Sequence, residues 1–127
     1  MKYIFDNCIS PRFPLMLSAL GVEAVSLRDE FSEDVDDVSF YGSLRGQNVI
    51  VVTTDTRQIT REQEARALKE SGVTAIFFGP FWARMHLWDQ AKWLVSKWQR
   101  ISAFAESVTK GTVAEIKQNG RAQVYPV

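Results

Sequence analysis

Two short apolar runs in this chain each end in an aspartate. Residues 3–5 (Tyr-Ile-Phe) run into Asp6, and residues 49–53 (Val-Ile-Val-Val-Thr) run through Thr54 into Asp55. Apolar, β-prone runs of this length are typical of strands buried on both faces of a parallel sheet. Open α/β sheets bind their ligands at the carboxyl ends of such strands. If the two strands are neighbours, the sequence predicts that Asp6 and Asp55 converge at one sheet edge.

Helix signals separate the strand-like segments. Ser10 and Pro11 supply a cap residue and a proline at the first helical position, and Gly21 is placed to end that helix. Thr60 and Gln63 form a capping-box pattern for a later helix. Strands are predicted between the helices at residues 2–5, 22–27, 48–53 and 73–78. This alternation favours a three-layer α/β domain with a mostly parallel central sheet.

A long helix is predicted over residues 87–105. Its apolar side chains recur every three or four residues, at Leu87, Ala91, Leu94, Trp98, Ile101 and Ala105. Trp88, Trp93 and Phe104 lie beside this stripe, where they either cover the edge of the sheet or face a partner chain, such as a second copy in a homodimer. Two β-tolerant runs around Asn119 and Gly120 predict a terminal β-hairpin. We expect this hairpin to be an appendage outside the alternating unit.

Composition limits both the size of the fold and its chemistry. At 127 residues, 46% of them hydrophobic, the chain is expected to form a single domain over residues 1–127. Its 15 basic and 15 acidic residues balance, so the totals alone predict no polyanionic partner. With one His and one Cys, a zinc site of nitrogen and sulfur ligands is nearly excluded, which leaves hard cations on carboxylates. No segment has the pattern of a signal peptide or membrane span, so we expect a cytoplasmic protein without membrane partners.

Residues 28–37 form an acidic stretch ahead of a short predicted helix. Asp36 or Asp37 is expected to cap that helix, and the stretch could be an ordinary solvated loop. Alternatively, an acid from this loop joins Asp6 and Asp55 in an all-oxygen pocket suited to Mg²⁺ or Mn²⁺. Clustered carboxylates repel one another unless a divalent ion neutralises them. Such a site would support metal-assisted hydrolysis of a phosphodiester in a nucleic acid backbone.

Basic residues near these acids in sequence are candidates for holding phosphates. Arg12, Arg57 and Arg61 could keep a polyanion close to an acidic centre, and Arg84 and Lys92 could extend the track. The alternative for each is an ordinary surface cation. Arg57, which closely follows the second acidic strand end, is the strongest candidate.

Other features carry less weight. A receiver-type domain also places aspartates at strand ends around Mg²⁺, but it needs an acidic pair after its first strand and a lysine after its fifth. Here Asp6 is followed by Asn7, and no lysine directly follows residues 73–78. His86 is expected to be a surface residue at a helix start, and Cys8 a small packing residue.

Five short motifs follow one another between residues 3 and 82. They are Phe5-Asp6-Asn7-Cys8-Ile9-Ser10-Pro11, Leu27-Arg28-Asp29, Asp37-Val38-Ser39-Phe40, Val51-Val52-Thr53-Thr54-Asp55-Thr56-Arg57, and Glu64 with Ala67-Leu68. In order and spacing this set resembles the PIN-like nuclease domains, in particular the compact VapC-like toxins of bacterial toxin–antitoxin pairs.

The resemblance implies a Rossmann-like PIN fold with a core at residues 1–82, to which residues 83–127 add a C-terminal helix and hairpin. It implies a Mg²⁺- or Mn²⁺-dependent endoribonuclease that cleaves RNA as a toxin, and a cognate antitoxin that occludes the site. By position, Asp6, Asp37 and Asp55 resemble the catalytic, metal-binding acids. The supporting residues of the family correspond to Asn7, Thr54 and Arg57.

The chain departs from the larger PIN pattern, which usually has four acids. A fourth acid is not evident here, since Glu62 and Glu64 sit on a predicted helix, and Asp36 competes with Asp37 for the middle position. The competing interpretation is a catalytically inactive PIN-like module that binds RNA or a partner protein.

Overall fold

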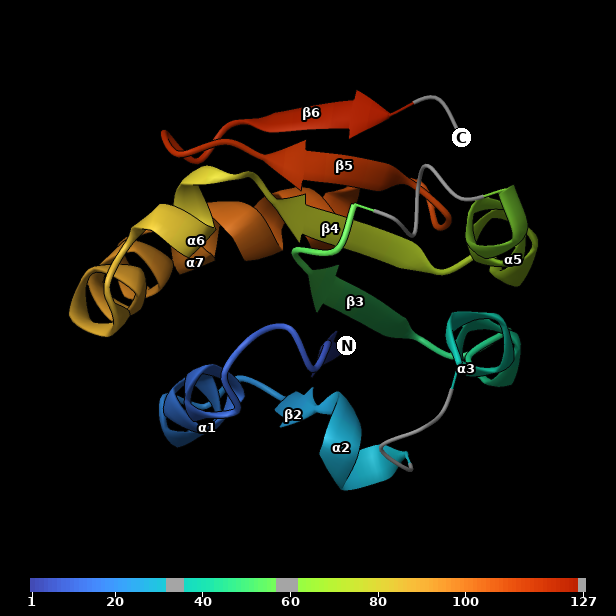
Figure 1. The fold of residues 1–127 in the computed structure, drawn as a ribbon, viewed down its shortest axis with the longest axis horizontal. Coiled ribbons are helices and arrows are strands. Elements are labelled where there is room, and N and C mark those ends of the chain that lie inside the picture. The colour runs from blue at the N-terminus through green and yellow to red at the C-terminus, as the bar shows by residue number, and fades with distance from the viewer. Residues whose placement is uncertain (32–35, 57–61, 126–127) are drawn as a thin grey trace.

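The computed structural model describes residues 1–31, 36–56 and 62–125 (Figure 1). Its strands are β1 (Lys2–Phe5), β2 (Ala24–Ser26), β3 (Val49–Thr53), β4 (Thr74–Phe78), β5 (Val113–Ile116) and β6 (Ala122–Tyr125). Its helices are α1 (Arg12–Ala19), α2 (Leu27–Glu30), α3 (Asp37–Ser43), α5 (Glu62–Ser71), α6 (Phe81–Arg84) and α7 (Leu87–Ser107). None of the described helices combines the length and apolar character that a membrane span needs.

The strands form one six-stranded sheet in the order β2-β1-β3-β4-β5-β6. β1 pairs in parallel with β2 and β3, β3 with β4, and β4 with β5, whereas β6 is antiparallel to β5. The register sets Phe5 opposite Val52, and Thr53 opposite Phe77. The prediction of a mostly parallel sheet is confirmed. Because β1 and β3 are parallel neighbours, their carboxyl ends lie at the same edge.

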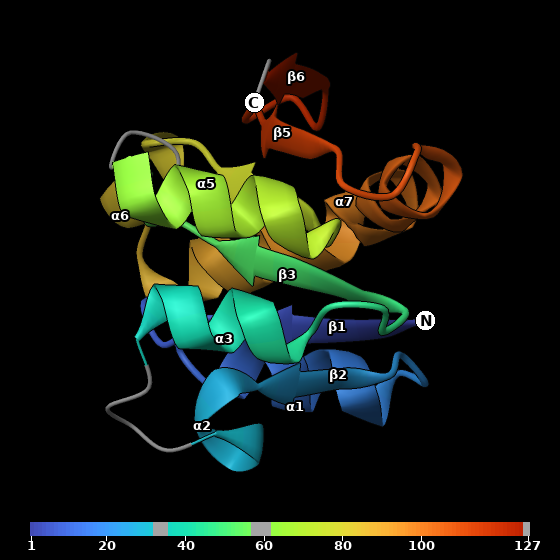
Figure 2. The ribbon, with the colours of Figure 1, turned by 90° about the vertical axis from the view of Figure 1, so that its right-hand side faces the viewer.

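Helices cover both faces of the sheet and complete the predicted three layers. In Figure 1, α1, α6 and α7 lie to the left of the sheet and α3 and α5 to the right, and Figure 2 shows α3 and α5 side by side in front of β3. Because side chains alternate along a strand, Tyr3 and Phe5 join the core beneath α1 and α7, whereas Ile4 joins the core beneath α3 and α5. Both faces of β1 are therefore buried, as its apolar sequence indicates.

The terminal hairpin is part of the sheet, so the expectation of an appendage is wrong. α7 leads back to β5, which pairs in parallel with β4 and sets Glu115 opposite Phe77. Val113 and Ile116 are buried on opposite faces of the sheet. The physical reason is that parallel strands need a long crossover connection, which α7 supplies. The exposed edge of β4 then offers its backbone groups to β5.

Two short helices fall where the sequence pattern predicts none. α2 occupies the start of the acidic stretch, where the Asp29 carboxylate accepts a hydrogen bond from the Ser26 backbone N–H at 3.3 Å. α6 directly follows Pro80, whose φ of −61° is already close to the helical value. A single helical turn is too short to show helical periodicity, so local hydrogen bonds and proline geometry decide these segments.

The aromatic residues of α7 divide between the core and the surface. Trp93 is buried, its ring packs against Phe78 and Phe81, and its Nε1–H donates to the carbonyl oxygen of Gln118 at 2.7 Å. Trp88 is 79% exposed. Trp93 therefore covers the sheet, which was one of the two alternatives for these aromatic residues. Trp88 instead presents its ring to solvent.

Candidate functional site

Asp6 and Asp55 lie at the carboxyl ends of neighbouring strands. The backbone N–H of Asp6 donates to the carbonyl oxygen of Val52 at 2.9 Å, so the ladder between β1 and β3 continues as far as the acid. Asp55 follows the last residue of β3 after Thr54. Both aspartates are partly exposed. The structure therefore brings these two candidate acids to the same edge of the sheet.

The side chain of Thr53 connects the two acids. Its hydroxyl donates a hydrogen bond to Asp6 Oδ2 at 2.9 Å and accepts one from the backbone N–H of Asp55 at 3.0 Å. A hydroxyl carries a single hydrogen, which here goes to Asp6, and its lone pairs remain for other donors. Thr53 is 0% exposed, so its position is set by packing within the sheet. The contact orients the Asp6 carboxylate relative to the backbone that carries Asp55.

Sequence reasoning missed Thr53 as a site residue, although a signal was present. Side chains at positions i and i+2 of a strand share a face, and Thr53 lies two residues before Asp55. Thr53 is also a small hydroxyl residue at the end of an otherwise apolar strand. These two facts together could have identified it as a link between acids.

Cys8 is exposed, so the expectation of a packing residue is wrong. Its Sγ lies 3.3 Å from Thr53 Oγ1 and accepts a hydrogen bond from the Thr54 backbone N–H at 3.3 Å. Its thiol also lies 3.8 Å from Asp6 Oδ2. A free cysteine often behaves as a small hydrophobic residue, but here the turn after β1 places the thiol against polar strand ends. Cys8 thereby joins the loop after β1 to the loop after β3.

Asn7 and Thr54, the expected supporting residues, contribute backbone groups. The Asn7 N–H donates to Asp6 Oδ1 at 2.7 Å, and Asn7 itself is exposed. Asp6 therefore accepts hydrogen bonds on both carboxylate oxygens, one from Asn7 and one from Thr53. These contacts hold the carboxylate in one orientation at the sheet edge.

The two candidates for the middle acid occupy different positions at the start of α3. Asp36 is the cap residue, and its Oδ1 accepts the backbone N–H of Ser39 at 2.7 Å. This hydrogen bond holds the pKa of Asp36 below its ordinary value. Asp37 is the first helical residue, and its side chain lies outside the described part of the structure. The capping role predicted for one of the pair belongs to Asp36.

The predicted phosphate-binding residues are described only in part. Arg12 is exposed at the first position of α1, next to the loop that leaves Asp6. Arg57 and Arg61 lie outside the described residues, as does the side chain of Glu64. Glu62 is exposed and forms an ion pair with Arg66 one turn along α5, at 2.9 Å.

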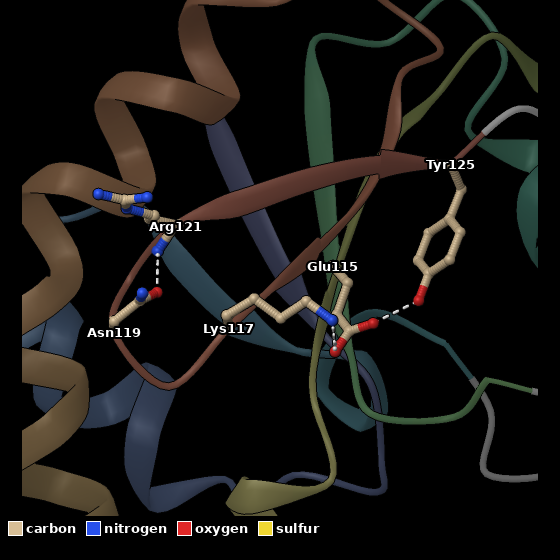
Figure 3. A network of polar contacts seen from close by, with 5 residues as sticks. All are labelled: Glu115, Lys117, Asn119, Arg121 and Tyr125. Carbon is tan, nitrogen blue, oxygen red and sulfur yellow. Dashed lines mark hydrogen bonds and ion pairs between the residues drawn. The ribbon is translucent and has the colours of Figure 1, made fainter.

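A carboxylate that sequence reasoning missed lies on β5. Glu115 stands opposite Phe77, which itself stands opposite Thr53, so Glu115 and Thr53 share a register row with one strand between them. Figure 3 shows its carboxylate between Tyr125, whose hydroxyl donates to it, and Lys117, whose Nζ lies 3.2 Å away. The hydrogen bond to Glu115 raises the pKa of the Tyr125 hydroxyl above its usual value. Because the hairpin was expected to be an appendage outside the alternating unit, Glu115 was not considered as a site residue.

Gly79 makes room for the Glu115 carboxylate. A Cβ atom at position 79 would lie 2.6 Å from Glu115 Oε2, well inside van der Waals contact. The carboxylate therefore extends over the end of β4, the strand next to β3. Any larger residue at position 79 would displace it.

The described part of the chain places two acidic residues, Asp6 and Asp55, at this edge of the sheet. Within residues 1–31, 36–56 and 62–125, no group of three or more His, Cys, Asp or Glu side chains is arranged to hold a metal ion. Mg²⁺ typically keeps several waters and binds through one or two carboxylates together with substrate phosphates. Two carboxylates are therefore enough for a magnesium site of this kind.

A family model described as a PIN like domain matches residues 1–80 of the chain. The match runs from β1 through β4 and includes the three aspartates that the sequence singled out, Asp6, Asp37 and Asp55. α7 and the β5–β6 hairpin lie outside it. No curated protein and no solved structure matches the chain at a significant level.

Proposed function

The chain belongs to the family of PIN-like domains, a nuclease-type family, and on this basis we propose that it is a metal-dependent endoribonuclease. Its substrate would be RNA, cleaved by hydrolysis of a phosphodiester bond. We propose further that it acts as the toxin of a toxin–antitoxin pair in the cytoplasm, where a cognate antitoxin covers the site. The observation that carries the enzymatic proposal is the pair of aspartates, Asp6 and Asp55, joined at one sheet edge by the Thr53 hydroxyl.

The proposed roles follow from the chemistry of each side chain. Asp6 and Asp55 would hold Mg²⁺ or Mn²⁺, with Asp37 as the third acid. The bound cation would lower the pKa of its water and stabilise charge on the phosphoryl oxygens. Thr53 and the Asn7 backbone N–H keep the Asp6 carboxylate oriented. Phosphates of the RNA on either side of the scissile bond would be held by the guanidinium groups of Arg12, Arg57 and Arg61.

The test is cleavage of a labelled RNA by the purified chain, free of any partner, in Mn²⁺ or Mg²⁺. We expect Asp6→Asn and Asp55→Asn each to abolish cleavage, because each removes a charged oxygen ligand. An asparagine at position 6 keeps one acceptor oxygen, so we expect the fold and the melting temperature to be largely retained. Glu23→Gln is a matched control, since Glu23 is exposed and precedes β2 at the opposite, amino-terminal edge of the sheet. Marked unfolding of both test variants would instead make these aspartates structural.

A second candidate function is a PIN-like module that binds RNA or a protein without cleaving. It is favoured by the absence of a three-ligand cluster among the described His, Cys, Asp and Glu side chains. The same assay separates the two. Lack of cleavage of any tested RNA by the wild-type chain, in either metal, would make the binding module the better description.

A further inference from the structure

A surface pocket of about 230 Å³ opens between the starts of α1 and α7. We call it the α1–α7 pocket. Its walls are almost entirely apolar, and Arg12 is the one charged residue among those that line it. The lining residues are Arg12, Phe13, Met16, Leu87, Trp88 and Ala91.

The topology places this pocket at the same edge of the sheet as the candidate acids. β1 ends at Phe5, and after the loop that contains Asp6 the chain starts α1 at Arg12. β4 ends at the same edge, and α6 then leads into α7. The first residues of both helices therefore lie on the carboxyl-end side of the sheet, and Figure 1 shows α1, α6 and α7 together to the left of it.

The exposed indole of the pocket is unusual within this chain. Trp88 is 79% exposed, whereas the other three tryptophans are between 5% and 7% exposed and belong to the core: Trp82, Trp93 and Trp98. Burial of an indole removes a large apolar area from water, so the exposed Trp88 ring is available to stabilise a ligand that enters the pocket.

Cations outnumber acids among the lining residues of the pocket and their close neighbours in sequence. Arg12 lines it, Arg84 precedes Leu87 by three residues, and Lys92 follows Ala91. All three cations are exposed, and within the described part of the chain no ion pair involves them. Over residues 84–92, Asp89 is the one acidic residue. The pocket therefore combines an exposed indole with a lining cation, Arg12, for which the described residues provide no ion-pair partner.

Resting on the proposed function, we propose that the α1–α7 pocket is a base-binding subsite for single-stranded RNA. One nucleobase enters the pocket and stacks on the Trp88 indole, while Arg12, Arg84 and Lys92 contact the flanking phosphates. Aromatic platforms beside a cationic track are the common means of holding single strands, because every base has a π-face. The subsite would hold the strand next to the acidic edge and so select unpaired RNA.

The size and charge of the pocket favour a base over a protein. Sites for drug-sized ligands usually have volumes of about 300–1,000 Å³, so a pocket of this size suits a single ring system. A stable protein interface usually covers about 800 Å² on each partner. A second copy of this chain, docked pocket to pocket, would also bring the two copies of Arg12 together, and like charges repel.

The first experiment measures binding without cleavage. A fluorescein-labelled single-stranded RNA of eight nucleotides is titrated with the full chain in EDTA, and anisotropy is recorded. We expect saturable binding that Trp88→Leu weakens about tenfold, because base–aromatic stacking is lost. Trp88→Tyr keeps an aromatic face and should restore most of the affinity. Val95→Ser, on the exposed side of α7 outside the pocket lining, is the matched control and should bind as the parent does.

Two further arms test the single-strand and phosphate components. A duplex of the same RNA should bind no better to the parent than to Trp88→Leu, because its bases are stacked and unavailable. Arg12→Gln should reduce the slope of log affinity against log salt by about 0.7, the value for one phosphate contact to a single strand. Equal binding of single strand and duplex by the parent would overturn the proposal, as would Trp88→Leu binding the single strand as tightly as the parent.

The outcomes separate this subsite from the proposed nuclease activity. RNA binding that depends on Trp88, without cleavage in Mn²⁺, would retain the subsite and refute the enzyme. Cleavage of the single strand with unaltered kinetics in Trp88→Leu would retain the enzyme and refute the subsite. Absence of RNA binding overturns the subsite, and so does a dimer in sedimentation that Trp88→Glu converts to monomer, since the pocket would then be an interface between copies.

Discussion

At the scale of single residues, the site depends on one buried hydroxyl. Thr53 is the residue through which the Asp6 carboxylate and the Asp55 backbone share a hydrogen-bonded link. Its side chain is enclosed by the sheet, so the link is held by packing that does not involve solvent. The residues around the acids therefore contribute orientation, while the acids supply the charge.

We expect Thr53→Val to lower the free energy of unfolding by about 1–2 kcal/mol, because the hydrogen bonds to Asp6 and Asp55 are lost. RNA cleavage in Mn²⁺ should fall by about 10- to 100-fold, the usual effect of removing a group that orients a metal-binding side chain. Urea unfolding and cleavage rates measure the two effects. Thr53→Ser keeps the hydroxyl and should preserve most of both. Full activity in the valine variant would make Thr53 purely structural.

At the scale of secondary-structure elements, α3 shows how a helix end separates two adjacent acids. Asp36 adopts an extended backbone, with φ −80° and ψ 160°, and caps the helix through Ser39. Asp37 begins the helix. The sequence offered both residues for the cap and for the middle acid, and the cap is now assigned to Asp36. Because Asp36 is engaged as the cap, our proposal uses Asp37 as the middle acid.

The cap gives a pH-dependent prediction. The pKa of Asp36 is lowered in the folded state, so its ionised form stabilises α3 above the ordinary aspartate pKa, and this contribution is lost as pH falls through the lowered value. Asp36→Asn can still cap the helix, but its side chain does not titrate. The difference in melting temperature between the parent and this variant should therefore shift against the parent as pH drops from 7 toward 3. Asp36→Ala should melt a few degrees lower at pH 7.

Thermal melts followed by circular dichroism at each pH measure these differences, and RNA cleavage at pH 7 tests the assignment of the acids. Asp36→Asn should retain cleavage, whereas Asp37→Asn should lose it. Loss of cleavage in Asp36→Asn with an intact melt would return Asp36 to the catalytic set.

At the scale of the whole molecule, the hairpin and α7 complete the sheet that carries the site. β5 covers the edge of β4, and β6 in turn pairs with β5. Both apolar cores contain a β5 residue, Ile116 in one and Val113 in the other. The family match ends at residue 80, yet the sheet continues beyond it.

Removal of residues 113–127 should therefore prevent cooperative folding of the remaining chain. Burial of the Val113 and Ile116 side chains contributes about 3–6 kcal/mol, a large part of the usual total stability. Urea denaturation followed by circular dichroism should show a broad or absent transition in the truncated chain. Val124→Thr, which changes an exposed β6 residue, should unfold as the parent does. A sharp, undiminished transition after truncation would show that the hairpin is an appendage after all.

Local pattern alone determined much of this protein. The apolar strands β1 and β3, their terminal aspartates and the 3.6-residue stripe of α7 follow from side-chain type and spacing, which act within one element. The same local information identified the motifs that place the chain among PIN-like domains. The alternation of strands and helices was enough to predict a parallel sheet, because short connections leave few other topologies.

Tertiary structure alone decided which residues meet. Thr53 and Cys8 join the candidate site through pairing of strands that are far apart in sequence, and no local period reports such pairing. The insertion of β5 beside β4, and the separation of buried Trp93 from exposed Trp88, likewise depend on how α7 packs across the sheet. Pattern specifies which face of an element is apolar, whereas the packing of all elements together specifies what each polar end contacts.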